Sequence, residues 1–323
     1  DHEKAGHRGE AYLLLLASLL GMNLMAVSAD LIMLYLAIET ASIPLYVLSG
    51  FLLADDRSTE AGFKYLLFGT LASTIMLYGF SLIFGFAGTT NIYMLSQLFT
   101  SGDISVLLAF SVFALVIVGL GFKLAIVPFQ FWAPDVYQGS PTPVAGFLST
   151  ASKAAGFAVV IRFFFVAFPS FAPSWTLIFA ALAAITMTVG NLLAISQTNI
   201  KRLLAYSSIA HAGYALIGVV AFSQLGAASV VFYLAAYIAT NLLAFGVVMA
   251  FSRVTGLEDI TDYAGLSRRN PLMGLMMLAA FLSLAGMPPF GGFVAKVFVF
   301  AAGVQANYTW LVVVGILNSI IGV

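Results

Sequence analysis

Long runs of apolar residues, separated by short polar stretches, occupy almost the whole chain. The runs cover approximately 11–28, 31–53, 62–86, 104–127, 142–167, 175–196, 200–222, 226–252, 272–301 and 308 onward. Each is close to the roughly 20 residues that an α-helix needs to cross the hydrocarbon core of a bilayer. The pattern therefore predicts an all-α, polytopic membrane protein with about ten transmembrane helices.

Two of the runs are interrupted by residues that break helices. The fourth continues into Pro128 and Pro134, and the ninth contains Pro288 and Pro289 followed by two glycines. Inside lipid, irregular backbone survives only where protein or a water-filled cavity satisfies its open N–H and C=O groups. Matched interruptions in two halves of a chain are typical of the ion path of a secondary transporter.

Ten runs divide into two sets of five, and an odd number per set inverts the second set in the membrane. We therefore expect two inverted repeats. The first covers 1–170, with its broken helix near 123–137, and the second covers 171–323, with its broken helix near 286–293. Hydropathy and the positions of the breaks carry this prediction, because the two halves show no visible similarity residue by residue.

Lysine and arginine gather in alternate loops. One side of the predicted bundle holds Lys4, Arg8, Arg57, Lys201, Arg202, Arg253, Arg268 and Arg269, and Arg162 is the exception. By the positive-inside rule, this side and the N-terminus face the cytoplasm or its organellar equivalent. The first ten residues lack the order of a signal peptide, and the last apolar run stops without a polar flank. We therefore expect both ends to be cuts through a longer protein.

Composition narrows the possible functions. The 323 residues are 62% hydrophobic and only 8% charged, which leaves little room for a soluble catalytic domain. Cysteine is absent, which excludes disulfides, thiolate metal sites and cysteine-ligated iron–sulfur clusters. The net charge is zero, and no phosphate-binding loop, dinucleotide-binding glycine pattern or metal-ligand cluster is visible. We therefore expect no cofactor or metal in this chain, no nucleic-acid partner, and the lipid bilayer as its surroundings.

A few ionisable residues lie within or just inside the apolar runs. They are Glu39, Lys64, Lys123, Lys153, His211 and Lys296. A charge at the bilayer centre costs about 2.5 to 3.5 kcal/mol on insertion scales, so it is kept where it pairs or functions. Burial disfavours the charged form of an amine and a nearby carboxylate favours it, so such lysines can exchange protons. The set predicts a proton path.

Each candidate also has a structural interpretation. Glu39 is expected to pair with Lys123 and set its proton affinity, or else to form an ion pair that only holds two helices together. Lys153 and Lys296 are expected to carry protons, with helix packing as the alternative.

The remaining polar candidates are less distinctive. His211 ordinarily titrates near neutral pH, which suits a relay between the halves, but its hydroxyl-bearing neighbours equally suit a hydrogen-bonded packing residue. Lys64 lies near the positive side and is able to snorkel to the membrane surface. Asp135 is expected in a loop, as a structural cap or interface residue.

Three motifs resemble one known family. The stretch FKLAIVPFQFWAPDVYQGSPTPVAGFLSTASK, together with KRLLAYSSIAHAGY and AGMPPFGGFVAK, is similar to the antiporter-like membrane subunits of proton-pumping NADH:quinone oxidoreductase, respiratory complex I. DVYQGSPTPV looks most like the branch known as subunit N or subunit 2. That family normally has about fourteen helices, so the resemblance implies that this chain is the central ten.

The resemblance also implies roles. Glu39 matches the family's first-half carboxylate, Lys123 its partner on the broken helix, Lys153 the connecting lysine, His211 the central relay position and Lys296 the terminal lysine. Lys64 matches the family's lysine in GFKYLLFGTLAS.

The implied function is proton translocation along these residues, driven by quinone reduction in other subunits of an NADH:quinone oxidoreductase. The implied partners are other antiporter-like and small membrane subunits. NADH and quinone would be used by the whole complex and not by this chain. The implied location is a bacterial plasma membrane, with an organellar inner or thylakoid membrane as the alternative.

Two other functions remain open. Subunits of multi-subunit Na⁺/H⁺ antiporters and of membrane-bound hydrogenases share the fold, and DVYQGSPTPV argues against them. A structural membrane scaffold is the second alternative. It predicts that apolar replacement of both Glu39 and Lys123 leaves pumping intact.

Overall fold

Helices make up the structure, a computed structural model that describes residues 8–100 and 106–322. In the first half they are α2 (Arg8–Val27), α3 (Leu31–Ser49), α4 (Asp56–Ala87), α5 (Ile92–Thr100), α6 (Val106–Leu124), α7 (Trp132–Gly139), α8 (Thr142–Phe147), the π-helix η1 (Leu148–Ser152), α9 (Lys153–Arg162) and the π-helix η2 (Phe163–Ala167). After the 3₁₀ turn η3 (Pro169–Phe171) come α10 (Ala172–Ile195), α11 (Ile200–Val220), α12 (Gln224–Thr255), the 3₁₀ turn η4 (Ile260–Tyr263), α13 (Leu266–Arg269), α14 (Pro271–Ala285), α15 (Gly291–Gln305) and α16 (Thr309–Ile321). Over the described ranges no strand forms, so the all-α prediction is confirmed.

The predicted apolar runs coincide with these helices. Eight helical segments in the described part of the chain are long and apolar enough to cross a membrane. The three shorter apolar helices are α14, α15 and α16. Large apolar side chains on the outer faces are exposed, for example Leu13 and Leu16 on α2, as expected for helices that face lipid or neighbouring subunits. The number of crossings stays a prediction.

Both predicted broken helices are present. The first ends at Leu124, and an irregular segment with Pro128 separates α6 from α7. The second ends at Gly286, which has φ +83° and returns its N–H to the carbonyls of Leu282 and Ser283. A left-handed residue of this kind is the usual end of an α-helix, and glycine adopts it at low cost. Two prolines then separate α14 from α15.

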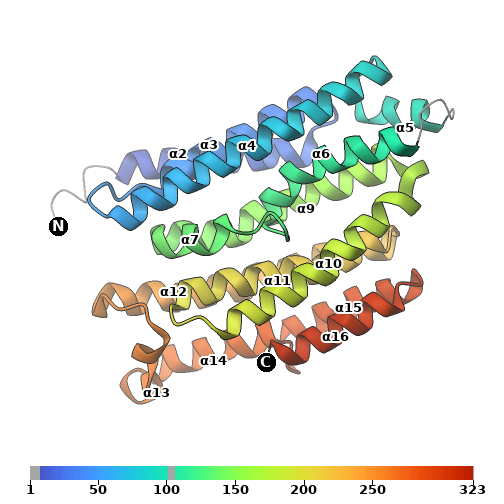
Figure 1. Cartoon of the computed structure of the whole chain (residues 1–323). Coiled ribbons are helices and arrows are strands. Elements are labelled where there is room, and N and C mark those ends of the chain that lie inside the picture. The colour runs from blue at the N-terminus through green and yellow to red at the C-terminus, as the bar shows by residue number, and fades with distance from the viewer. Residues whose placement is uncertain (1–7, 101–105, 323) are drawn as a thin grey trace.

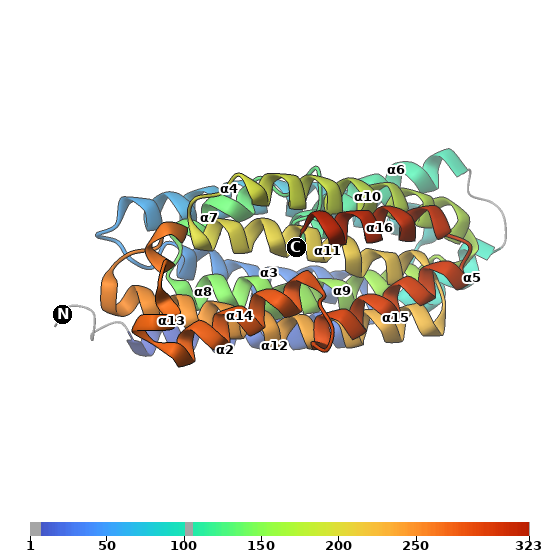
Figure 2. The same ribbon diagram turned by 90° about the horizontal axis from the view of Figure 1, so that it is seen from below.

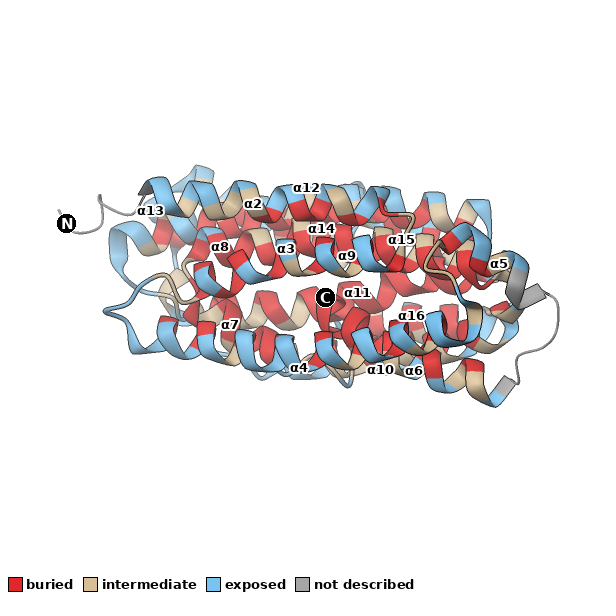
Figure 3. Ribbon diagram, turned by 90° about the horizontal axis from the view of Figure 1, so that it is seen from above, coloured by how far each residue is buried: buried red, intermediate tan, exposed pale blue. Residues whose placement is uncertain are grey.

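The helices pack in successive layers across the molecule (Figure 1). At one edge lie α2, α3 and α4, followed by α6, α7 and α9, then α10, α11 and α12, and finally α14, α15 and α16. Burial is concentrated on the faces that meet between layers (Figure 3). Among the eight helical segments long enough to cross a membrane, α11, in the middle, is the most enclosed, because 83% of its most apolar 18 residues are buried.

The two halves share a local bonding pattern. A two-residue β-bridge joins Asp30 to Asn91 in the first half, and another joins Asn199 to Asp259 in the second. The backbone bonds are Leu31 N–H to Thr90 and Ile92 N–H to Ala29, then Ile200 N–H to Glu258 and Ile260 N–H to Thr198, all 2.8 to 2.9 Å. In each half the bridge ties the start of the second helix to the end of a 32-residue third helix, α4 or α12.

The two bridges lie at opposite ends of the bundle. The segment after the first bridge, α5, is at one end, and α13, which comes after the second, is at the other (Figures 1 and 2). This is the placement that an inverted repeat requires.

Basic residues within the described ranges also separate by end. Arg57 contacts Gly139, and Arg202 pairs with Asp135, which places these elements at the end where α13 lies. Arg162, the predicted exception, is at the opposite end, where it donates to the Ala26 carbonyl and to Tyr93. Lys4 lies outside the described residues.

Candidate functional site

Of the five basic side chains that are buried in the described structure, four lack a carboxylate partner, and the fifth, Lys201, pairs with Glu258. Lys123, Lys153 and Lys296 are 5%, 3% and 5% exposed, and His211 is 8% exposed. In the described structure none of the three lysines forms an ion pair. Buried charges without a partner are costly, so groups of this kind mark ion or proton sites far more often than they stabilise a fold.

Lys123 is in the last turn of α6, directly before the first break. Its Nζ donates to the Ser42 hydroxyl of α3 at 2.9 Å. Glu39 lies one turn before Ser42 on α3 and accepts a hydrogen bond from Ser73 of α4. The predicted direct pair between Glu39 and Lys123 is therefore not formed. The reason is local, because each charged group bonds to a nearby hydroxyl: Lys123 to Ser42, three residues after Glu39 on α3, and Glu39 to Ser73.

Lys153 begins α9, immediately after the π-helix η1. A π-turn inserts an extra residue and rotates the next part of the helix about its axis, and such turns are frequent at functional sites. The Lys153 side chain crosses to α11 and donates to the Ser208 backbone carbonyl at 2.6 Å. Lys153 thus joins the first half of the chain to the second.

His211 lies one turn beyond Ser208 on α11. Its Nδ1 is 2.6 Å from the Tyr233 hydroxyl of α12, and its ring lies 5.0 Å from the Tyr237 ring. The predicted hydrogen-bonded environment is therefore present. It fits the relay and the packing interpretations equally.

Lys296 is on α15, after the second break. Its Nζ donates to the Ala285 carbonyl at 2.9 Å and to the Ser319 hydroxyl at 2.8 Å. It also lies 4.7 Å from the centre of the Tyr214 ring, a cation–π distance. Lys123 precedes its break and Lys296 comes after its own, so the two lysines occupy different positions relative to the interrupted segments.

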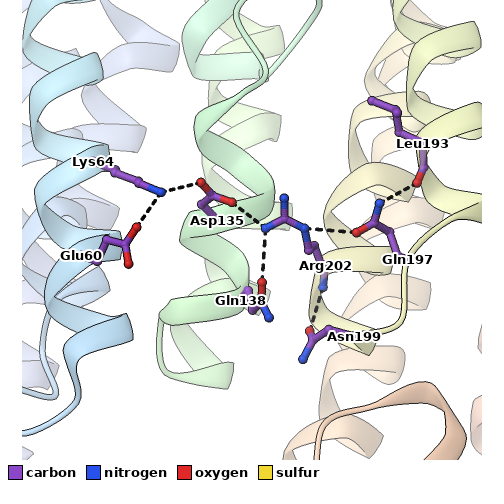
Figure 4. Close-up of polar contacts among 8 residues, drawn as sticks. All are labelled: Glu60, Lys64, Asp135, Gln138, Leu193, Gln197, Asn199 and Arg202. Carbon is purple, nitrogen blue, oxygen red and sulfur yellow. Dashed lines mark hydrogen bonds and ion pairs between the residues drawn. The ribbon is translucent and has the colours of Figure 1, made fainter.

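Lys64 belongs to a separate polar cluster (Figure 4). Its Nζ is 2.7 Å from Glu60, one turn earlier on α4, and 2.7 Å from Asp135 on α7. Asp135 also pairs with Arg202 of α11 at 2.5 Å, and Arg202 reaches Gln138 at 3.2 Å. The cluster ties the two halves together at their basic end.

Two sequence predictions change here. Asp135 lies in a short helix and not in a loop, although its predicted role at an interface is supported by its two pairs. Lys64 does not simply snorkel, because it bridges two carboxylates. Beside these groups is an open cavity of about 230 Å³, lined by Arg57, Glu60, Ala61, Lys64, Asp135, Gln138 and Gly139.

The buried groups succeed one another across the layers. Lys123 bonds from the second layer to the first, Lys153 from the second to the third, and Lys296 within the fourth (Figure 1). His211 occupies the third layer. These four residues, called the row below, therefore extend across three of the four layers. Throughout the described ranges, no group of three His, Asp or Glu side chains gathers as metal ligands would.

The comparisons with known proteins agree with this arrangement. A family model described as NADH:quinone oxidoreductase/Mrp antiporter, TM, matches residues 28–322. The chain belongs to this family. The resemblance predicted from the three sequence motifs is thereby confirmed.

Individual members of the antiporter family are similar over nearly the whole chain. Subunit N of the NADH-quinone oxidoreductase of Moorella thermoacetica is 49% identical over 99% of this chain and 67% of its own length. A subunit N of Chloroherpeton thalassium is 43% identical over 97% of this chain. The chain spans 63% of that second relative, so it corresponds to about two thirds of the length of family members.

Solved complexes contain the same fold. A chain of respiratory complex I from Thermus thermophilus has a TM-score of 0.83 at 38% identity, covering 98% of this chain and 68% of that one. A chain of the Mrp complex from Dietzia has a TM-score of 0.86 at 28% identity, covering 96% and 57%. The antiporter-family fold is therefore confirmed, and the protein is an integral membrane protein.

Several polar residues that contact the candidate residues in this antiporter-family chain are not among the residues predicted from the sequence. Ser42 and Ser73 lie within apolar helices without a distinguishing pattern. The pair of Glu60 with Lys64 could have been predicted, because an acidic residue four positions before a lysine on a helix favours an ion pair. Tyr233 carried no such signal, since aromatic residues in apolar helices are usually core.

Proposed function

We propose that this chain is the proton-translocating membrane subunit of an NADH:quinone oxidoreductase in a bacterial plasma membrane. The observation that carries the proposal is the row of Lys123, Lys153, His211 and Lys296, buried without ion pairs in the described structure and spread over three layers of the bundle. Identity of 49% to a subunit N supports the oxidoreductase in particular.

Each candidate residue has a different role in moving the proton. Glu39, one turn before the Ser42 hydroxyl that Lys123 contacts, sets the field at Lys123, so that a change at Glu39 changes whether Lys123 holds its proton. Lys153 carries the proton from the first half to the second, His211 connects it onward, and Lys296 is the last carrier. Lys64 supplies a polar contact near the basic end, beside the 230 Å³ cavity.

The energy has to come from outside the chain. Moving one charge against the membrane potential requires about 2.3 kcal/mol per 100 mV. Quinone reduction by NADH in other subunits supplies it, and those subunits hold the redox cofactors. This chain contributes to the enzyme as a proton-translocating subunit, in contact with other antiporter-like and small membrane subunits.

The same proposal includes two inverted five-helix repeats, 1–170 and 171–323. Support comes from the paired bridges at opposite ends of the bundle and from the equal lengths of α4 and α12. In this arrangement each half presents one broken helix to the row of buried amines.

A second candidate is a subunit of a multi-subunit cation/proton antiporter. The fold matches the Mrp complex of Dietzia as well as it matches complex I, with TM-scores of 0.86 and 0.83. Sequence identity separates them, 38% to the complex I chain against 28% to the Mrp chain. Purified complex that reduces quinone with NADH and acidifies vesicles without sodium supports the oxidoreductase and rejects the antiporter.

The decisive test is Lys123→Ala in the full-length subunit, assembled in membranes of its host. We expect proton pumping to fall at least tenfold, because the first buried amine is lost, while the amount of assembled complex is unchanged. Lys201→Ala is the matched control: Lys201 is also buried, at 4% exposure, but it pairs with Glu258 outside the row at 2.8 Å. Normal pumping by Lys123→Ala in an assembled complex would reject the proposed path.

A further inference from the structure

The π-turn η1 sets the direction of the Lys153 side chain. The helical segment Thr142–Ala167 is continuous, and η1 inserts one extra residue into it directly before Lys153. One residue corresponds to a rotation of about 100° around a helix axis. If η1 were regular α-helix, Lys153 would therefore point in a different direction relative to α8. Its Nζ would then lose the Ser208 carbonyl of α11, which is now 2.6 Å away.

The sequence of η1 does not force this turn. Leu148–Ser152 reads LSTAS, without a proline or glycine that would interrupt a regular helix. π-Turns are rare, so a sequence of this kind forms α-helix unless other contacts oppose it. Groups outside the segment therefore have to stabilise the π-turn.

A chain of two hydrogen bonds ties η1 to α12. The Ser149 hydroxyl donates to the Gly146 carbonyl at 2.8 Å, at the entry to the turn. The Ser149 oxygen accepts from the amide Nδ2 of Asn241 on α12 at 2.6 Å. Ser149 is 0% exposed and Asn241 is 1% exposed, so solvent does not compete for this bond. Because the serine proton is used on Gly146, its oxygen needs a donor, which an amide supplies and a carboxylate does not.

A close approach of α12 brings Asn241 within reach of η1. Phe245 follows Asn241 by one turn on α12, and Gly146 precedes Ser149 by about one turn. A Cβ added to Gly146 would lie 3.3 Å from the Phe245 Cβ, which is tighter than most contacts. The absence of a side chain at Gly146 thus lets the two helices come together. The two contacts hold the segment around η1 against α12 at neighbouring points.

We propose that Asn241 is a positioning residue: by holding Ser149, it keeps η1 in its π-turn and thereby keeps Lys153 directed at α11. This proposal rests on the proposed function, in which Lys153 carries a proton between the halves. Asn241 itself takes no proton. Asn241 and Ser208 both belong to the second half of the chain, so that half fixes both the turn before Lys153 and the group that its amine contacts.

The test is Asn241→Leu in the full-length subunit within the assembled complex. Leucine has a similar size but no N–H, so Ser149 loses its partner. We expect the protons pumped per quinone reduced to fall at least fivefold. We also expect a solved structure of the variant to show regular α-helix at 148–152, with the Lys153 Nζ beyond hydrogen-bonding distance of the Ser208 carbonyl. An unchanged contact between Lys153 and Ser208 would overturn the proposal.

The double variant Asn241→Leu with Ser149→Ala separates positioning from stability. Replacing both partners of a buried hydrogen bond by apolar groups can be nearly neutral for stability, because no buried group is left unpaired. If Asn241 positions Lys153, assembly and thermal stability recover in the double variant while pumping stays low. Pumping that recovers together with stability would mean that Asn241 only satisfies a hydroxyl, which rejects the proposal. Should Asn241→Leu not assemble, the double variant and its structure decide.

Tyr308→Phe is the matched control. The Tyr308 hydroxyl donates at 2.9 Å to Thr176, whose own hydroxyl donates within its helix at 2.6 Å. This is the same arrangement of two bonds as in Asn241 and Ser149, but it joins α10 to the start of α16 and has no part in holding η1. The variant should pump at the parental rate, with Lys153 in place.

Lys153→Ala distinguishes failure of this proposal from failure of the proposed function. If Lys153→Ala stops pumping while Asn241→Leu pumps normally, only the positioning role is wrong. If Lys153→Ala pumps normally, the proposed path is wrong. The position of Lys153 in the structure of Asn241→Leu then still decides whether Asn241 holds it.

Discussion

The Lys296 amine has its position because a single glycine leaves room for it. A Cβ added to Gly286 would lie 2.8 Å from Lys296 Cδ and 3.1 Å from its Nζ. Gly286 also has φ +83°, which costs a residue with a side chain about 1 to 2 kcal/mol. The residue that ends α14 is thus the one that admits the amine of α15.

Gly286→Ala should therefore displace the Lys296 amine from Ala285 and Ser319 and lower pumping severalfold in the assembled complex. Gly256→Ala is its control, because Gly256 has a similar φ of +74° but nothing within 4 Å of an added Cβ. Both variants carry the backbone cost, and only the first meets Lys296. Equal pumping by the two variants would show that the contact with the lysine is unimportant.

Among single residues, burial could be predicted from the sequence and hydrogen-bond partners could not. The burial of Lys123, Lys153 and Lys296 was predictable, because each is an isolated charge in an apolar run. Their partners were not: Glu39 bonds to Ser73 and Lys123 to Ser42, since short hydroxyl side chains within reach replace a direct ion pair. Hydrophobic periodicity reports which face is buried and says nothing about which side chains meet across helices.

Between elements, the short helix α7 is held by charge. Asp135 is the common partner of Lys64 from α4 and Arg202 from α11, at 2.7 and 2.5 Å. About a third of each of the three side chains is exposed, so one such pair contributes only about 0.2 to 1 kcal/mol. The two pairs together still hold α7 to α4 of the first half and to α11 of the second.

Asp135→Asn should loosen that junction. The amide keeps the shape but loses the charge, and a loss of about 1 kcal/mol lowers the melting temperature by about 1 to 2 °C in a chain of 323 residues, because the unfolding entropy is about 2.1 cal/mol/K per residue. Thermal unfolding of the full-length subunit in its complex, at low and high salt, measures the effect. The difference from the parent should shrink at high salt, because ions screen exposed pairs.

Glu60→Gln is the control for that experiment. It removes the partner of Lys64 within α4, a pair four residues apart that contributes at most about 0.5 kcal/mol to a helix. Equal losses from Asp135→Asn and Glu60→Gln would mean that the contact between helices adds nothing.

Helix breaks were predictable as elements, and their internal geometry was not. Proline and glycine placed the interruptions after Leu124 and after Gly286 correctly, because both residues limit helix propagation. The same residues predicted a loop around Asp135, but Trp132–Gly139 forms a short helix with Pro134 in its first turn. The π-turn before Lys153 has no proline or glycine of its own, and it depends on tertiary packing that a single sequence does not display.

Across the whole molecule, the buried groups form one row and not two separate sites. Lys153 belongs to the first half of the chain but donates to α11 of the second, so in the proposed function the two halves share the middle of one path. If both halves use a single proton path, blocking that path at one point stops all proton flow. Interrupting it at either end stops the same flow.

The double variant Lys123→Ala with Lys296→Ala tests that consequence. If there is a single path, each replacement alone lowers pumping at least tenfold. Combining the two replacements then causes no further loss, so the double variant pumps at the rate of the less active single variant. If each half conducted its own proton, each single variant would retain about half of the pumping and the double variant would lose all of it. Non-additivity between sites this far apart requires a shared process, since independent sites normally add. Acidification per quinone reduced, measured in the parent and the three variants at equal assembly, separates the two outcomes.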